Sequence, residues 1–174
     1  MKQFSFHTSV KLLKDSAGTT LIELLVVMGL LGGMLVIITT LFTSSVDSQV
    51  QSKSYSAPTE SSHFIVARLN YDIARASAIS TPVNMGDIAD QLVMTIDGNT
   101  YTYSLDNGNL TLDDGNGPAN LNSNDVTVSD VSFRKLGVAG SPATISYSFK
   151  LTSKIQSHAG LVSRTYTSTV RQNL

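Results

Sequence analysis

The sequence predicts an α+β protein, in which a long apolar N-terminal helix continues into an amphipathic helix packed on an antiparallel β-sheet. Three observations support this fold class. No charged residue occurs between Leu24 and Phe42, apolar residues recur at helical spacing between residues 63 and 80, and apolar and polar residues alternate beyond residue 90. A helix followed by a series of strands is typical of α+β domains with the helix on one face of the sheet.

Composition narrows the class of protein. The chain has 174 residues, which suits one modest domain with an appendage, and its net charge is −1. A broad basic surface is therefore not expected, and binding to nucleic acid is not indicated. Because the sequence contains no cysteine, disulfides, thiolate metal sites and thiol nucleophiles are excluded.

The uncharged run from Leu24 to Phe42 has the length of a membrane span. A helix over these residues extends about 29 Å, close to the thickness of the bilayer hydrocarbon. Lys2, Lys11 and Lys14 precede the run. Since positive residues stay in the cytoplasm, we expect a single-pass membrane protein whose N-terminus is cytoplasmic and whose bulk lies outside.

Three interpretations of this segment predict different mature chains. In the first, the segment is a plain signal anchor. In the second, it is a secretory signal that is cut after the run, near the sequence FTSS. In the third, the cut comes before the run, at Gly18. Glu23 favours the third, because an unpaired acid at the border of an apolar run costs a few kcal/mol if it enters lipid. The alternative is that Glu23 merely complements the helix dipole in the first turn, a contribution of roughly 0.3–1 kcal/mol.

The stretch AGTTLIELLVVMGLLGGML resembles the N-terminal signal of type IV pilins and type II secretion pseudopilins. In that family a prepilin peptidase cuts after a Gly, the new N-terminus is usually methylated, and Glu is the fifth mature residue. Gly18 matches the residue before the cut, Thr19 matches the first mature and methylated residue, and Glu23 matches the fifth. The close resemblance covers about residues 16–42. It departs from the family at Thr19, where Phe or another apolar residue is usual, and no proline interrupts the apolar helix.

The resemblance implies four parts: a leader peptide 1–18, a transmembrane and filament-core helix 19–42, a polar helix extension or linker 43–62, and an exposed α+β domain 63–174. It implies a structural subunit of a type IV pilus or a type II secretion pseudopilus, in the inner (cytoplasmic) membrane before assembly. The implied partners are prepilin peptidase, other pilin or pseudopilin subunits, the inner-membrane assembly platform and the membrane. Absence of cysteine favours a minor pilin or pseudopilin over a major pilin with the usual C-terminal disulfide.

Cleavage after Gly18 would place an ammonium group near Glu23. The α-amine of Thr19 would have an ordinary pKa of about 7.7–8.0. Opposite charges about 4 Å apart gain roughly 4 kcal/mol at an effective dielectric constant of 20. The resemblance implies that Glu23 acts in assembly by meeting the N-terminus of a neighbouring subunit. The amine of the same chain lies about 6 Å away along the helix, so the sequence leaves both partners open.

The polar stretch 43–62 is expected to continue the helix to about Ser56, with a break or kink at Pro58. A second helical segment then runs toward Pro82, with Ile65, Leu69, Ile73, Ala76 and Ile79 on its apolar side. Asp72 can pair with Arg68 and Arg75, and these charged residues are interpreted as a solvated face.

Six later segments alternate as strands do: QLVMTID, TYTYSL, NLTL, VTVSDVSFRKL, ATISYSFKLT and LVSRTYTSTVR. Asp97-Gly98 and Asn107-Gly108 predict tight hairpin turns. The apolar phase slips between Val128 and Val131, which predicts a bulge or a break near Ser129-Asp130.

No constellation of catalytic residues can be assembled from the sequence. The histidines are His7, His63 and His158, and no serine lies in a Gly-x-Ser-x-Gly elbow. The loop 112–125 carries Asp and Asn oxygens that suit Ca²⁺, but these residues are equally those of plain turns, and turns are favoured. We therefore expect no catalytic residue, metal site or cofactor. The alternatives to a filament subunit are a membrane-anchored extracytoplasmic binding module and a secreted enzyme with an ordinary signal peptide.

Overall fold

The computed structural model describes residues 20–138, 140–156 and 160–173. One helix, α1, spans Leu21–Arg75, and β-strands follow it along the described chain. The strands are β1 (Ala78–Thr81), β2 (Ile88–Ala89), β3 (Leu92–Ile96), β4 (Asn99–Asp106), β5 (Asn109–Asp113), β6 (Pro118–Asn120), β7 (Val126–Leu136), β8 (Thr144–Ser153) and β9 (Ser163–Arg171). The chain divides into two compact units with a boundary between Thr43 and Ser44.

Helix α1 continues through Pro58, so the helix does not break there. A proline inside a helix removes one backbone hydrogen bond and costs about 3 kcal/mol. Here Pro58 is buried together with Ser54, Ser61 and Ser62, and its packing offsets that cost. These small residues continue the spacing of the apolar stripe at Ile65, so the polar stretch shares one buried face with the segment that follows it.

The helix ends at Arg75, several residues before the end that Pro82 predicts. Residues Ala78–Thr81 instead form β1, which pairs antiparallel with β3. The backbone N–H of Ser77 donates to the carbonyl of Thr95 at 2.8 Å and starts this pairing. Ile79 is buried as expected, but from a strand, because its apolar side chain fits the inward phase of either element.

The strands form two antiparallel sheets where the sequence predicts one. The first has the order β1-β3-β4-β5-β6 and the second the order β2-β7-β8-β9. The short strands β1, β2 and β6 were not among the expected strands. The expected antiparallel arrangement and the six longer strands are confirmed.

The predicted turns and the bulge are confirmed by backbone geometry. Asp97 and Gly98 both have positive φ, of 51° and 83°, and join β3 to β4. Asn107 and Gly108 have φ of 47° and 76° and join β4 to β5, as the mirror-image turn of a two-residue hairpin requires. The β7–β8 register shifts between Ser129 and Ser132, where Asp130 has φ of 52°.

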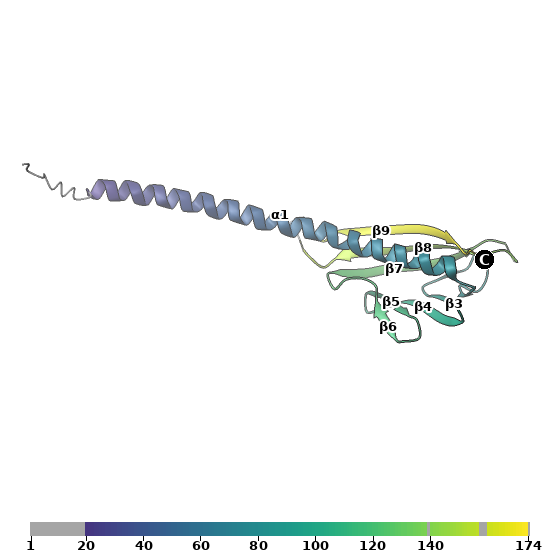
Figure 1. Cartoon of the computed structure of the whole chain (residues 1–174). Coiled ribbons are helices and arrows are strands. Elements are labelled where there is room, and N and C mark those ends of the chain that lie inside the picture. The colour runs from purple at the N-terminus through teal and green to yellow at the C-terminus, as the bar shows by residue number, and fades with distance from the viewer. Residues whose placement is uncertain (1–19, 139, 157–159, 174) are drawn as a thin grey trace, which may run out of the picture. The chain divides into compact units, whose positions relative to one another are not determined.

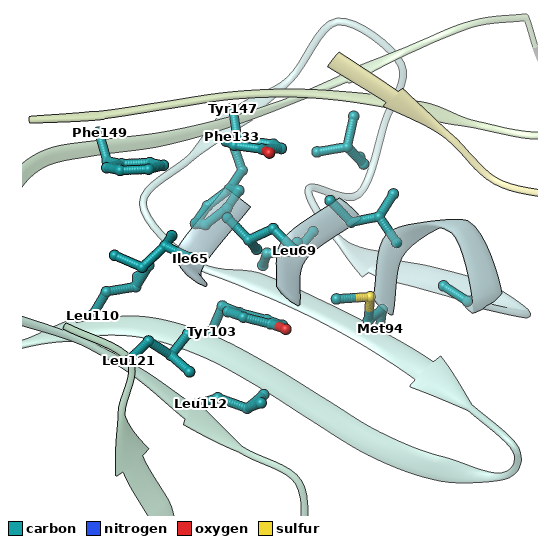
Figure 2. Close-up of a cluster of buried hydrophobic side chains, with 14 of the residues drawn as sticks. Ile65, Leu69, Met94, Tyr103, Leu110, Leu112, Leu121, Phe133, Tyr147 and Phe149 are labelled. Carbon is teal, nitrogen blue, oxygen red and sulfur yellow. The ribbon is translucent and has the colours of Figure 1, made fainter. Parts of the chain in front are cut away.

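The core of the unit that begins at Ser44 forms between the helix and both sheets. Figure 2 shows Ile65 and Leu69 of α1 between Tyr147 and Phe149 on one side and Tyr103 on the other. These aromatic residues belong to different sheets, because Tyr103 is in β4 and the other two are in β8. Figure 1 shows β8 in one layer and β4 in the other. Large apolar side chains from three layers are thereby removed from water, which supplies most of the favourable free energy of folding.

Candidate functional site

Glu23 lies in the first turn of α1, at the position where a negative side chain complements the helix dipole. Its backbone N–H donates to the Oγ1 of Thr20 at 3.3 Å, so Thr20 caps the helix. Thr20 and Glu23 have the spacing of a capping box, in which the acid can also reach back toward the cap residue. The observed bond uses the backbone N–H of Glu23 and not its carboxylate.

The segment of α1 that follows Glu23 is apolar on every side. Between Leu21 and Phe42 the large apolar side chains are 50–78% exposed. Within the described residues, one helix, α1, is long enough and apolar enough to cross a membrane. The expected membrane-spanning length is thus present, and exposed apolar surface of this extent in a soluble monomer marks a membrane or a protein interface.

The threonine hydroxyls of this segment donate hydrogen bonds to backbone carbonyls of the same helix. The Oγ1 of Thr39 donates to the carbonyl of Leu35, and that of Thr40 to the carbonyl of Val36, each at 2.8 Å. Such back-bonding leaves no hydroxyl in need of water, as burial in lipid or in a helix bundle requires.

The glycines of the apolar segment leave a depression on the helix surface. Gly29, Gly32 and Gly33 have open space where a Cβ would stand. Val27, Leu30, Leu31, Met34 and Ile37 form the rest of the depression around Gly29 and Gly33. Small residues of this kind let helices approach closely within membranes.

Gly18 and Thr19, the predicted cleavage and methylation residues, lie outside the described residues. Within the described part, ion pairs join Arg68 to Asp72, Arg75 to Asp97, and Lys150 to Asp130, and none includes Glu23. The structure therefore places Glu23 at the helix start but leaves its partner undefined.

A buried charged cluster was missed by the sequence interpretation. Asp72, expected on a solvated face, is 1% exposed. The Nε of Arg68 donates to its Oδ2 at 2.7 Å, and the phenol of Tyr103 donates to the same oxygen at 2.5 Å. The predicted pairing with Arg68 is confirmed, whereas Arg75 pairs with Asp97 instead of Asp72. Burial and the neighbouring carboxylate raise the pKa of Tyr103 well above its usual range.

The position of Asp72 could have been found in the sequence. It follows Leu69 by three residues and Ile65 by seven, so it lies within the apolar stripe of the helix. A carboxylate at such a position needs a partner, because an unpaired buried charge is very costly. Arg68 and Tyr103 are its partners, and Tyr103 is the one buried residue of β4.

The loop 112–125 has the hydrogen bonds of turns. The Oδ1 of Asp113 accepts from the backbone N–H of Gly115 at 2.9 Å and of Gly117 at 3.2 Å. Asn116 donates from its backbone and its amide to the Oδ1 of Asp114, which lowers the pKa of that acid. These contacts agree with the turn interpretation over a calcium site.

Asn122 holds the end of this loop against the sheet. Its Oδ1 accepts from the backbone N–H of Leu110, and its Nδ2 donates to the carbonyl of Val126, both at 2.9 Å. The side chain is buried, and its amide satisfies the backbone N–H of Leu110 and the backbone carbonyl of Val126. Asn122 is therefore a structural residue of the loop.

The described residues contain no cluster of side chains suited to metal binding. His63 is exposed on α1, whereas His7 and His158 lie outside the described ranges. Across residues 20–138, 140–156 and 160–173, the His, Cys, Asp and Glu side chains form no group of three that could hold a metal ion. The candidate site is thus the start of α1 and the apolar surface that follows it.

Comparison of the chain with protein-family models, with curated proteins and with solved structures finds no match. The functional argument therefore depends on the residues of this chain and on their arrangement.

Proposed function

We propose that this protein is a structural subunit, a minor pilin or pseudopilin, of a type IV pilus or a type II secretion pseudopilus. Its precursor is a single-pass protein of the inner membrane with a cytoplasmic N-terminus. A prepilin peptidase removes residues 1–18 by cutting after Gly18, and the mature chain begins at Thr19. Its partners are then other subunits of the filament and the inner-membrane platform that assembles them.

One observation carries the proposal: α1 is apolar and exposed on every side from Leu24 to Phe42, with the carboxylate of Glu23 at its front edge. A segment of this kind suits two environments, the bilayer and the core of a helical filament, and a subunit that passes from one to the other needs both. Glu23 would be answered in the filament by a terminal ammonium, so that neither charge is buried alone.

The described residues that follow the apolar segment are compatible with a structural subunit. The strands form a packed domain whose core is closed by the C-terminal part of α1. A membrane-anchored binding module is the second candidate, and it shares this domain. The two differ at the N-terminus, because a plain anchor has no use for Glu23 or for a cut at Gly18.

The assembly step is tested by chemical cross-linking in cells. Because the natural chain has no cysteine, Ser45→Cys and Ser52→Cys, both on the exposed surface of α1, introduce the sole thiols. A bifunctional thiol reagent should convert the double variant into a ladder of multimers, and the ladder should disappear when Glu23 is also changed to Ala. A product that remains monomeric, or a ladder that is unaffected by the change at Glu23, contradicts the proposal.

A further inference from the structure

The two sheets have four edges, and three of them are poor templates for another strand. Edges β1, β6 and β2 have four, three and two residues, and β6 begins with Pro118, which has no N–H. Edge β9 has nine residues and no proline. Natural proteins blunt sheet edges with short strands, prolines, bulges and charged side chains. Of these devices β9 has only the charges of Arg164 and Arg171.

The backbone of β9 is regular along its whole length. It pairs with β8 in unbroken register from Thr144↔Arg171 to Thr152↔Ser163, unlike β7, which bulges at Asp130. In an antiparallel pair, alternate residues direct their N–H and C=O groups away from the partner strand. Among the described residues the backbone of β9 pairs with β8 alone, so an ordered row of donors and acceptors faces outward.

The side chains of β9 are less covered than those of its neighbour. Tyr166, Ser168 and Val170 are half-buried, while the β8 residues opposite them, Phe149, Tyr147 and Ile145, are fully buried. The hydroxyl of Tyr166 is the one buried side-chain polar atom that lacks a hydrogen-bond partner in the described part of the chain. The β9 side chains on this face are therefore less covered than those of β8.

Charge defines the chemistry of that neighbour. β9 carries Arg164 near one end and Arg171 at the other, both exposed, and it carries no acidic residue. Neither guanidinium forms an ion pair with a carboxylate of the described residues. A second copy's β9 would bring four arginines into one pair of strands, and the other edges of a second copy are much shorter than β9. An acidic segment of another protein fits better.

We propose that β9 is a docking edge, which binds an extended, proline-free segment of a partner protein that carries acidic side chains at both ends. The segment adds a fifth strand to the second sheet, its backbone supplies the hydrogen bonds, and its carboxylates pair with Arg164 and Arg171. This inference concerns the unit 44–174 and holds whether or not the chain is cut after Gly18.

The test uses the full-length protein in detergent and a fluorescent eight-residue peptide that has Glu at both ends and alternates Thr and Val between them. The two Glu are then seven residues apart, as Arg164 and Arg171 are, so each can face one of them on its own side of the sheet. Fluorescence anisotropy should report binding, and replacing both Glu with Lys should weaken it by roughly tenfold, since two exposed charge pairs change sign. Methylating the backbone nitrogens of the peptide that face β9 should abolish binding, because they can then no longer donate hydrogen bonds to the carbonyls of β9.

A charge swap locates the site on β9. The Arg164→Glu, Arg171→Glu double variant should prefer the Lys peptide, whereas Arg134→Glu, a change of exposed charge on β7, should keep the preference of the wild-type chain. Amide hydrogen exchange should slow along β9 and not along β1, β2 or β6 when the Glu peptide is bound. Absence of binding, protection at another edge, or a β9-dependent dimer of the protein alone would each overturn the proposal.

Discussion

The phenol of Tyr103 donates a 2.5 Å hydrogen bond to the carboxylate of Asp72, and both side chains are withdrawn from water. The bond joins helix α1 to strand β4, which are far apart in the sequence. Arg68 completes the cluster from the helix and keeps the buried charge of Asp72 compensated. The contact fixes how the helix lies on the first sheet, because an apolar interface alone would tolerate small shifts along the helix axis.

Tyr103→Phe should destabilise the protein by about 1–3 kcal/mol, because Asp72 loses a buried hydrogen bond while the ring packing is kept. Chemical unfolding of the full chain in detergent, followed by circular dichroism, measures the change. Tyr55→Phe is the control, since Tyr55 is exposed on α1, the helix that carries Asp72. If both substitutions have the same small effect, the Asp72–Tyr103 bond contributes nothing to stability. In the Tyr103→Phe, Asp72→Ala double variant the two effects should not add, because each single substitution already removes the hydrogen bond between the two side chains.

The same pair predicts how stability depends on pH. Burial and Asp72 raise the pKa of Tyr103 above the ordinary value of about 10. The folded chain therefore keeps this proton at pH values where the unfolded chain has lost it. The contribution of Tyr103 is fully present below about pH 10 and falls as the pH rises, by up to about 1.4 kcal/mol per pH unit. Denaturation midpoints between neutral and strongly alkaline pH should decline less steeply in Tyr103→Phe, and identical slopes would contradict the assignment.

Two hairpin glycines provide a matched test of turn geometry. Gly98 and Gly108 both have positive φ, but a Cβ on Gly108 would lie 2.8 Å from the Cγ2 of Thr127, while nothing lies within 4 Å of one on Gly98. Gly98→Ala should cost about 1–2 kcal/mol of backbone strain. Gly108→Ala should cost about 1–3 kcal/mol more, because the β7 side chain must also move. Thermal unfolding of the two variants compares them directly, and equal losses would show that Thr127 yields freely.

The extent of processing should depend on the size of the residue at position 18. We expect Gly18→Ala to be processed nearly as well as the natural chain, while Gly18→Val leaves full-length precursor in the inner membrane. Immunoblotting of membrane fractions distinguishes the two forms by their size. Normal maturation of Gly18→Val would remove Gly18 from the processing site.

Glu23 is expected to act after cleavage. Glu23→Ala should leave processing intact and lower the recovery of the protein in sheared filaments. Glu23→Gln separates charge from helix capping, because Gln also serves in a capping box but cannot pair with an ammonium as a carboxylate does. Recovery as low as that of Glu23→Ala is the expected result for Gln, and recovery at the natural level would reduce Glu23 to a capping residue.

Local signals in the sequence predicted most of the strands and their turns. Alternation and the pairs Asp97-Gly98 and Asn107-Gly108 act over a few residues, so they do not depend on the rest of the fold. Pro58 shows the limit of such signals, because burial of that ring outweighs its local preference. Ile79 fits the inward phase of a helix or a strand, and pairing with β3 decides between them. The division into two sheets is likewise a property of packing.

The candidate site also has features that local sequence patterns predict and features that they do not. Glu23 and the apolar run follow from local pattern and are found where the sequence predicts them, at the start of α1 and along it. The partner of Glu23 is a property of assembly or of residues that precede the described chain. Asp72 was misassigned because charge was given more weight than its position in the apolar stripe.

The N-terminus of the protein purified from its native envelope tests the central claim most directly. Intact mass and N-terminal sequencing should find a chain that begins at Thr19, with or without an added methyl group, and should find the uncut chain in cells that lack the peptidase. A mature chain that begins at Met1, or at a residue beyond Phe42, would contradict the account and leave the anchored module or the secreted protein in its place.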